Sequence, residues 1–221
     1  AMKAGVKFKL GKDSLDGLTI AIKGIGKVGY QLANYVLEDG AKLIVADKSE
    51  DKMQYINELQ KQYPFKIEIV DHNEIHKKEV DVYSPCAMGN DIRISRISQM
   101  NCKVICGAAN NQLDIVDSAI AKQQLLDHKI LYVPDTIANA GGVFRSAGVI
   151  LKSRDEQESF KLITTIYDRT LNILDMASEH RISPADVCTE IGQAIKGKPN
   201  RFKMKLDGLA GVKAGNNTYK I

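Results

Sequence analysis

A glycine-rich segment near the N-terminus has the residue types and the spacing that can bind a nucleotide pyrophosphate. Residues 24–29 read G-I-G-K-V-G and fit the pattern G-x-G-x-x-G. In that pattern the first glycine permits a tight turn, the second lets a pyrophosphate approach the backbone, and the third lets a helix pack closely on the preceding strand. The helix N-terminus adds free N–H groups and a positive dipole end. The segment therefore predicts a dinucleotide-binding turn.

The acidic residue Asp47 stands about twenty residues beyond these glycines, at the end of the next predicted strand. A carboxylate there can accept hydrogen bonds from both ribose hydroxyls of an adenosine. Its charge would repel a 2′-phosphate, so we expect NAD to be preferred over NADP, with the adjacent Lys48 softening that preference. A glycine pattern alone is a weak signal, but the strand before it, the helix after it and the acid all agree. A tight turn without a ligand is the disfavoured alternative.

Two asparagines and a cysteine lie in later loops where they could also meet a cofactor. An amide at Asn110 or Asn139 can hydrogen-bond a ribose hydroxyl or a carboxamide, although asparagine also caps turns. We favour cofactor contact for Asn110 and leave both interpretations of Asn139 open. Cys86 has no histidine near it in sequence to activate it as a nucleophile, so backbone contact by its loop is favoured. The predicted cofactor-binding residues are Gly24, Gly26, Lys27, Val28, Gly29, Asp47, Lys48, Pro85, Cys86, Ala87, Ala108, Ala109, Asn110 and Asn139.

Catalytic patterns are scarce in this chain. Neither G-x-S-x-G nor H-E-x-x-H occurs. His72 and His76 have helix-compatible spacing but lie in a polar stretch, which predicts a solvated surface pair and no metal site. His128 and His180 stand alone and are predicted to be surface residues. We therefore expect no catalytic residue and no bound metal.

Composition excludes several classes of function. The 221 residues carry a net charge of +4 with lysines spread along the chain, so nucleic acid is a poor candidate for a partner. No long apolar segment or secretory signal is present, and we expect a cytoplasmic protein with no membrane partner. The four cysteines have no disulfide-framework spacing, and Cys102 and Cys106 are predicted to be buried thiols, as in a reducing compartment.

Strand and helix patterns alternate six times with short connections. This alternation predicts an α/β fold, a Rossmann-type doubly wound parallel sheet with added C-terminal helices. Ligands of such sheets lie at the carboxyl ends of the strands, so the loops at Gly24, Asp47, Pro85, Ala108 and Pro134 should open on one crevice. The predicted strands are 18–22, 43–46, 67–70, 80–84, 103–106 and 130–133, and the predicted helices between them include 48–63, 92–100 and 115–126.

The expected domain plan has four parts. Residues 1–17 form an N-terminal helix (2–9, weakened by Gly5) and a linker, residues 18–152 the dinucleotide-binding domain, 153–196 C-terminal helices, and 197–221 a flexible tail. A helix of small residues runs from 137 toward 151, and another starts at Ser183, with Pro184 at its first position. A single amphipathic helix is predicted for 153–180, with a buried stripe of Phe160, Ile163, Ile166, Tyr167, Leu171, Leu174 and Met176.

Several of these segments together resemble the C-terminal, cofactor-binding half of the glutamate/leucine/phenylalanine/valine dehydrogenase family, most closely its leucine dehydrogenase branch. The resemblance covers about 2–193, in order and with similar spacing, and this combination is far more specific than the glycine pattern. It differs at Gly29, where leucine dehydrogenases often carry alanine, and in the tail after Lys196. The segments that carry it are SLDG (14–17), GIGKVG (24–29), GAKLIVAD (40–47), DVYSPCAMG (81–89), GAANNQL (107–113) and NAGGV (139–143).

This resemblance implies NAD-linked oxidative deamination of an L-amino acid, branched-chain or apolar, to a 2-oxo acid and ammonia. In such enzymes the catalytic lysines and aspartate belong to an N-terminal domain, and no glycine-rich segment with a catalytic lysine is found here. The resemblance thus implies a chain that holds NAD but meets its amino-acid substrate only with a catalytic domain. A stand-alone, non-catalytic dinucleotide-binding protein is the alternative, while a folate or shikimate dehydrogenase-like chain fits the matched loops less well. Self-association into a homo-oligomer is open, because a missing domain would leave an apolar face.

Overall fold

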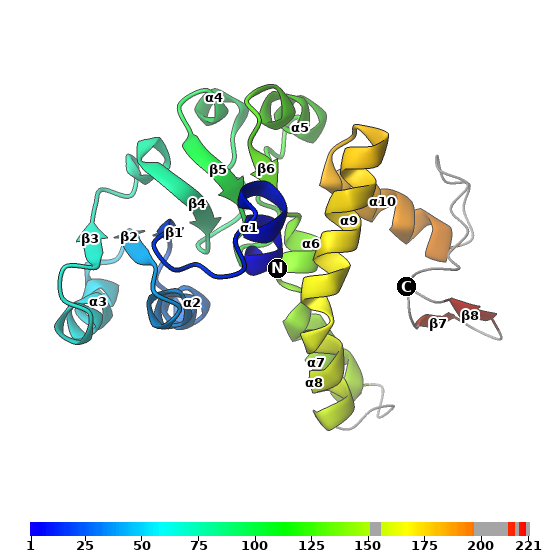
Figure 1. Cartoon of the computed structure of the whole chain (residues 1–221), viewed down its shortest axis with the longest axis horizontal. Coiled ribbons are helices and arrows are strands. Elements are labelled where there is room, and N and C mark those ends of the chain that lie inside the picture. The colour runs from blue at the N-terminus through cyan, green and yellow to red at the C-terminus, as the bar shows by residue number, and fades with distance from the viewer. Residues whose placement is uncertain (151–155, 197–211, 215–216, 220–221) are drawn as a thin grey trace.

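The computed structural model describes residues 1–150, 156–196, 212–214 and 217–219. Its main element is a six-stranded sheet in the order β3-β2-β1-β4-β5-β6, and every neighbouring pair in it is parallel (Figure 1). The strand order reverses between β1 and β4, which is the arrangement of doubly wound dinucleotide-binding sheets. The predicted fold class is confirmed. The strands are β1 (Thr19–Lys23), β2 (Lys42–Ala46), β3 (Ile67–Ile69), β4 (Glu79–Pro85), β5 (Asn101–Ile105) and β6 (Leu131–Tyr132).

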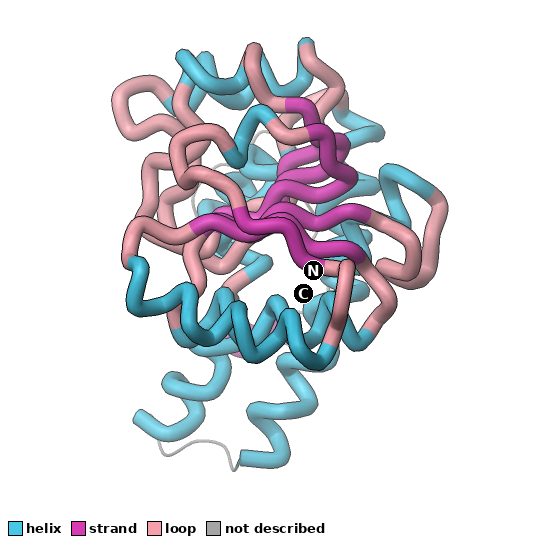
Figure 2. The backbone as a smooth tube through the Cα atoms, turned by 90° about the vertical axis from the view of Figure 1, so that its left-hand side faces the viewer, coloured by secondary structure: helices cyan, strands magenta, loops and turns pink. Residues whose placement is uncertain are grey.

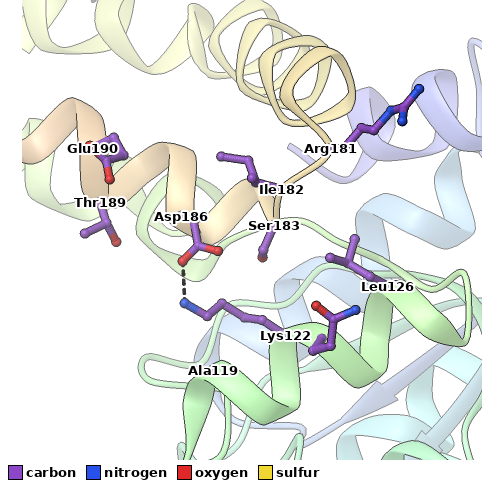
Figure 3. Close-up of a pocket in the computed structure, with 10 residues that line it drawn as sticks. Ala119, Lys122, Leu126, Arg181, Ile182, Ser183, Asp186, Thr189 and Glu190 are labelled. Carbon is purple, nitrogen blue, oxygen red and sulfur yellow. Dashed lines mark hydrogen bonds and ion pairs between the residues drawn. The ribbon is translucent and has the colours of Figure 1, made fainter. Parts of the chain in front are cut away.

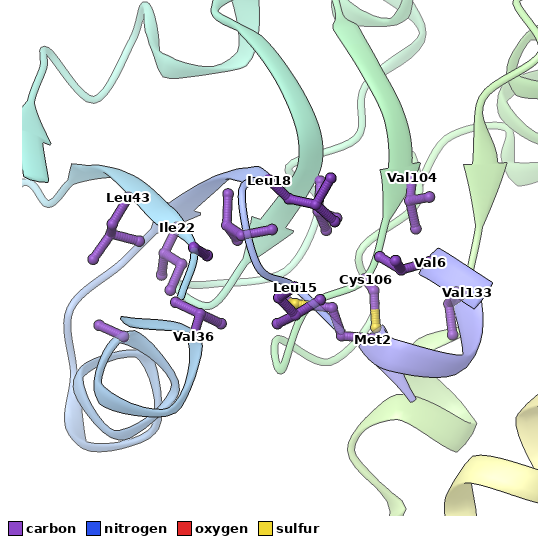
Figure 4. Packing of buried hydrophobic residues seen from close by; sticks show 14 of the residues in the cluster. Met2, Val6, Leu15, Leu18, Ile22, Val36, Leu43, Val104, Cys106 and Val133 are labelled. Atoms are coloured by element: carbon purple, nitrogen blue, oxygen red, sulfur yellow. The ribbon is translucent and has the colours of Figure 1, made fainter. Parts of the chain in front are cut away.

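Both faces of the sheet are covered, as the apolar pattern of the first strand predicts. Ile20 and Ile22 join a core on one face, whereas Ala21 joins a separate core on the other. The first core contains residues of α1 (Met2–Leu10), α2 (Lys27–Glu38), α3 (Glu50–Gln62) and α9 (Ile166–His180), and Figure 4 shows part of it. The second contains residues of η1 (Ile75–Lys77), α4 (Ile94–Ile97) and α5 (Ser118–Asp127).

The N-terminal helix packs on the same face of the sheet as its own linker, because Met2 and Val6 belong to the same core as Leu15. A Cβ on Gly5 would lie 2.8 Å from Val133 Cγ2 and 3.2 Å from Val104 Cγ1, so α1 approaches β5 and β6 more closely than any side chain allows. Val6 is buried beside them (Figure 4). The glycine that weakens the helix in isolation is thus the residue that lets it dock.

The helices after the sheet are more broken than the sequence indicates. In place of one helix over 153–180, α8 (Glu156–Thr164) and α9 meet at Thr165, whose hydroxyl donates to Leu162 O at 2.7 Å. Such back-bonding by threonine bends helices and explains the break. The predicted stripe is wrong at Phe160, which is 65% exposed. Residues 151–155, which hold the predicted boundary at 152, lie outside the described part.

Two further helices follow β6 in the chain and precede α8. They are α6 (Asp135–Ala138) and α7 (Ala140–Ile150), which replace the single helix predicted from 137. In both views α7 and α8 lie side by side and extend away from the sheet (Figures 1 and 2). The final helix, α10 (Pro184–Ile195), begins as predicted, because Ser183 Oγ accepts the Ala185 N–H at 3.3 Å.

Three predicted segments differ from the structure in extent. Helix α4 is one turn inside the predicted 92–100, and α5 starts at Ser118 because Asp117 Oδ1 accepts the N–H groups of Ala119 and Ile120. Within the predicted tail, β7 (Val212–Ala214) and β8 (Asn217–Tyr219) form an antiparallel pair that the sequence analysis did not predict. Residues 197–211, 215–216 and 220–221 lie outside the described part.

Candidate functional site

The glycine-rich turn has the geometry that each of its glycines is expected to provide. Gly24 has φ +101°, and a Cβ on it would lie 2.6 Å from the Ala87 backbone nitrogen. A Cβ on Gly29 would lie 1.9 Å from Gly24 O, so the start of α2 packs directly on the turn. A Cβ on Gly26 would meet nothing within 4 Å. The backbone at Gly26 is therefore open at the N-terminus of α2, where N–H groups have no partner within the helix.

Asp47 sits beside this turn and holds it. Its Oδ2 accepts the Ile25 N–H at 2.6 Å and its Oδ1 accepts the Ser49 N–H at 2.9 Å, while Lys52 Nζ lies 3.7 Å away. Burial opposes ionisation of this carboxyl, but the hydrogen bonds from Ser49 and Ile25 and the charge of Lys52 outweigh it and lower the pKa. The side chain is only 7% exposed. The sequence analysis missed this link between the acid and the turn.

The loops after β4 and β5 meet at the same edge of the sheet. Cys86 N–H donates to Lys23 O at 2.8 Å, and Ala109 N–H donates to Pro85 O at 3.0 Å. A Cβ on Gly107 would lie 2.2 Å from Pro85 O, so these two loops are in close contact. The loops at Gly24, Pro85 and Ala108 therefore open on one edge, as the topology predicts.

An apolar groove of about 540 Å³ joins the start of α2 to this edge. Val28 lines it from α2, and Ala108 and Ala138 line it from the loops beyond β5 and β6. Among the other predicted contacts, Lys27, Lys48 and Ala87 are exposed, whereas Pro85 and Ala109 are buried. The groove thus adds an apolar wall to the crevice, next to the polar groups of the strand ends.

Asn110 and Asn139 are brought together, although they lie far apart in sequence. Asn139 Nδ2 donates to Asn110 Oδ1 at 2.5 Å. Asn139 does not directly follow a strand; it ends α6 and stands at the break before α7. Nearby, Asp135 Oδ2 accepts the Asn111 N–H at 2.6 Å, and Asp135 Oδ1 accepts from Tyr132 OH at 3.1 Å. Side chains from beyond β6 therefore fix the loop after β5.

The cysteines are free thiols, and none has the surroundings of a nucleophile. Burial raises the pKa of Cys86, and its hydrogen-bond partners are the Ser84 hydroxyl, 3.4 Å from Sγ, and the Ala108 backbone. Burial also raises the pKa of Cys102 and of Cys106 to about 12. Cys106 is buried as predicted, whereas Cys102 is only partly so. At neutral pH all these thiols are protonated.

One polar cluster was not predicted, and it corrects the interpretation of His76. Asp91 Oδ1 pairs with Lys23 Nζ and accepts from Arg96 NH1 at 3.0 Å, and its Oδ2 accepts from Tyr83 OH at 2.5 Å. His76 is 6% exposed and its Nδ1 has no hydrogen-bond partner. Burial, with the charges of Arg96 and Lys23, lowers its pKa.

His76 is therefore not a solvated surface residue. It lies in η1, next to Ile75, which is fully buried in the second core. The packing of Ile75 brings the imidazole of His76 into the protein interior. His72 is half-buried, and His128 and His180 are exposed as predicted. In the described residues no group of three or more His, Cys, Asp or Glu side chains is arranged to hold a metal ion. No helix among them is long and apolar enough to cross a membrane.

A second, polar pocket lies away from the strand ends. It measures about 430 Å³ and lies between α5 and the start of α10, where Lys122 pairs with Asp186 (Figure 3). None of the residues that line it was predicted to contact a cofactor. The pair joins α10 to the body of the sheet domain.

The model of one family, "Glutamate/Leucine/Phenylalanine/Valine dehydrogenase", matches residues 3–180. The chain belongs to the glutamate/leucine/phenylalanine/valine dehydrogenase family. This confirms the resemblance, and it replaces the folate or shikimate dehydrogenase-like alternative. The matched part contains the glycine-rich turn, Asp47 and the two asparagines.

Three relatives in the family are themselves amino-acid dehydrogenases. The chain is 32% identical to L-tryptophan dehydrogenase of Nostoc punctiforme over 204 residues, which is 92% of this chain and 56% of that one. It is 36% identical to leucine dehydrogenase of Bacillus subtilis over 181 residues (82% and 47%), and 34% identical to valine dehydrogenase of Streptomyces virginiae over 193 (87% and 52%). The chain thus spans about half the length of these relatives.

Solved structures agree with the fold of the family. The crystal structure of L-tryptophan dehydrogenase from Nostoc punctiforme superposes with a TM-score of 0.79 at 31% identity, over 87% of this chain and 56% of that chain. A hetero-hexameric glutamate dehydrogenase from Thermus thermophilus superposes with a TM-score of 0.60 at 18% identity, over 83% and 49%. The second likeness shows the shared fold alone.

Proposed function

We propose that this chain is the NAD-binding half of an amino-acid dehydrogenase and that it lacks the catalytic half. The observation that carries the proposal is the open space beside Gly26 at the start of α2, where an added Cβ would meet no atom within 4 Å. A pyrophosphate fits such a place, because free N–H groups and the helix dipole favour an anion there. Family membership makes NAD the expected dinucleotide.

Each part of the crevice has a role in this proposal. The N-terminus of α2 binds the pyrophosphate, and Asp47 disfavours a 2′-phosphate by its negative charge. The loops that carry Ala109 and Asn110 hold the nicotinamide, because the second half of a doubly wound sheet binds the second mononucleotide. The bound NAD would accept a hydride from the substrate's α-carbon.

The substrate class in this proposal is an L-amino acid, branched-chain or apolar, that is converted to a 2-oxo acid and ammonia. The names of the relatives support it, since they act on leucine, valine or tryptophan. Hydride transfer needs the α-carbon about 3–3.5 Å from the nicotinamide and a base placed to take a proton. In the described residues we identify no such base at the crevice, so we expect the second wall and the base to come from a catalytic domain.

Calorimetry on the purified chain tests the binding step. NAD should bind, ADP-ribose should bind because it shares the pyrophosphate and adenosine, and NADP should bind more weakly than NAD. Equal affinity for NAD and NADP would contradict the role of Asp47. No binding of either dinucleotide would refute the proposed function.

An activity assay tests the rest of the proposal. The chain alone should show no oxidation of leucine, valine or phenylalanine, and a separately expressed catalytic domain from the same source should restore some turnover. Rapid turnover by the chain alone would overturn the proposal. The alternative is a stand-alone, non-catalytic dinucleotide-binding protein. This alternative predicts the same binding of NAD, but it predicts no turnover even when a catalytic domain is added.

Self-association is a further part of the proposal. Met88, Ile115 and Val116 are 87%, 78% and 89% exposed, and their loops are joined by a hydrogen bond from Ile115 N–H to Asn90 Oδ1 at 3.1 Å. Contiguous exposed apolar patches mark interaction surfaces, and in this proposal the three side chains form one. Sedimentation of the chain over a range of concentrations should reveal association, and a purely monomeric chain would contradict it.

A further inference from the structure

The side chain of Gln112 is buried inside the loop that follows β5. It is 0% exposed, and its Nε2 donates to Gly107 O and to Ala109 O, each at 2.8 Å. These two carbonyls flank Ala108, so one amide closes the loop onto itself. The opposite amide orientation would place Oε1 against two carbonyl oxygens, which accept and cannot donate. The direction of these bonds is therefore fixed by the loop.

The other end of the same amide has no partner. Gln112 Oε1 is a buried side-chain acceptor with no hydrogen bond. An unpaired buried acceptor is destabilising, and an apolar side chain of the same shape would avoid that cost. Stability alone therefore does not explain a glutamine here. The two donated bonds supply what an apolar residue could not, which is a defined path of the backbone from Gly107 to Ala109.

The loop is also held from outside, so that Gln112 acts within a rigid frame. Asn90 N–H donates to Asn111 O at 2.7 Å and Ile92 N–H donates to Gln112 O at 2.9 Å. On the other side, Asp135 accepts the Asn111 N–H and Asn139 donates to Asn110. The frame fixes residues 110–112. The stretch before Asn110 is held by Gln112, by the bond from Ala109 N–H to Pro85 O and by the hydrogen bond between the Ala108 backbone and Cys86.

We propose that Gln112 is a positioning residue for the nicotinamide half of the cofactor. Its hydrogen bonds to Gly107 O and Ala109 O fix the position of the Ala108–Ala109 backbone relative to the crevice. They thereby fix the position of Asn110, which follows directly. The adenosine half is held by a separate turn at Gly24 and Asp47, which Gln112 does not contact. The proposal rests on the proposed function, since it names a residue that acts on the binding of that same dinucleotide.

Comparing NAD with ADP-ribose tests this role, because ADP-ribose lacks the nicotinamide. Gln112→Met keeps the approximate shape and removes both donated bonds. We expect it to weaken NAD about tenfold and to change ADP-ribose by less than about twofold. Ile130→Val, a small core truncation just before β6 and so at the amino ends of the strands, is the control for lost stability. It should leave the ratio of the two affinities unchanged.

A second variant covers the case in which Gln112→Met does not fold. Gln112→Glu places a carboxyl group against two carbonyls, and burial should raise its pKa above the ordinary value of about 4.3. NAD should therefore weaken selectively at about pH 8, where the carboxylate is ionised, and recover in part at about pH 5, where the protonated carboxyl donates one bond. The wild-type chain at the same two pH values is the reference. An unchanged ratio of NAD to ADP-ribose affinity in both variants overturns this role while the wild type still binds NAD. Failure of the wild type to bind NAD overturns the proposed function itself.

Discussion

The two halves of the crevice reach the same edge of the sheet by different means. In the half formed by β1 and β2, the groups proposed to face the ligand are backbone groups of a turn, and the turn is set by glycines within six residues of one another. In the half formed by β4, β5 and β6, the corresponding groups are side chains and a loop. Hydrogen bonds from distant parts of the chain hold that loop, such as the one from Asn139 to Asn110.

This difference predicts how each half responds to substitution. A local backbone turn fails when a side chain fills its space, and such a failure should affect every ligand that carries the pyrophosphate. A loop held by several hydrogen bonds should lose only part of its ligand affinity when one of these bonds is removed. Each such loss should affect only ligands that carry the nicotinamide. ADP-ribose and NAD together therefore separate the two halves.

The largest effect is expected for Gly26→Val. The new side chain would occupy the space of the pyrophosphate, yet it would project into the open crevice and leave the fold intact. Affinity for both NAD and ADP-ribose should fall at least about a hundredfold. Gly192→Val is a matched control, because a Cβ there also meets nothing within 4 Å but lies in α10. Unaltered NAD affinity in a folded Gly26→Val chain would place the crevice elsewhere.

A smaller effect is expected for Asp47→Ala. Loss of the carboxylate removes the acceptor of the Ile25 N–H and the charge beside the ribose, so NAD and ADP-ribose should both weaken by about 1–3 kcal/mol. The preference for NAD over NADP should shrink. Asp81→Ala is the matched control, because Asp81 accepts the Thr19 N–H at 2.9 Å and pairs with Lys103 near the start of β1. If both variants weaken NAD alike, the effect is one of stability and not of the crevice.

A still smaller effect is expected for Asn139→Ala in the other half. The change removes the hydrogen bond from Asn139 Nδ2 to Asn110 Oδ1, so NAD should weaken by about 0.5–1.5 kcal/mol and ADP-ribose should not change. Isothermal calorimetry with the two ligands measures both. An equal loss for ADP-ribose would show that the two halves are mechanically coupled and would end the comparison.

The smallest effect concerns pH. The pKa of Asp47 is lowered in the folded chain, so its contribution is fully present above the unfolded value and is lost only as pH falls through the folded one. That window is acid, below the ordinary aspartate pKa of about 3.9. Between about pH 6.5 and about pH 8 the affinity for ADP-ribose should therefore change less than about twofold. A steep change in that range would mean that another group controls the turn.

The same difference decides what the sequence can predict. The sheet and the glycine turn follow from local patterns, such as alternating isoleucines in β1 and φ > 0 at Gly24, which a glycine adopts readily. The proposed role of Gln112 has no local sequence signal, because Gly107 O and Ala109 O become its acceptors only when the loop closes. The prediction that His76 is a surface residue was wrong for a similar reason. The polar residues around it gave no sign of the buried turn, which is held in the core by Ile75. Thr165 could have warned of the helix break, since two adjacent threonines favour back-bonding.

Helix α1 precedes all six strands of the sheet in the chain, yet the surface beneath it is the last part of the sheet to be synthesised. Val104 and Val133 fill the space beside Gly5, so α1 cannot bury Val6 until the ribosome has passed β6. Contacts between such distant parts of a chain form slowly. The apolar side of α1 is therefore exposed on the nascent chain while the earlier strands emerge, in the state that chaperones recognise. We expect α1 to dock only after all six strands have emerged and, by docking, to cover apolar surface through which the unfinished sheet can aggregate.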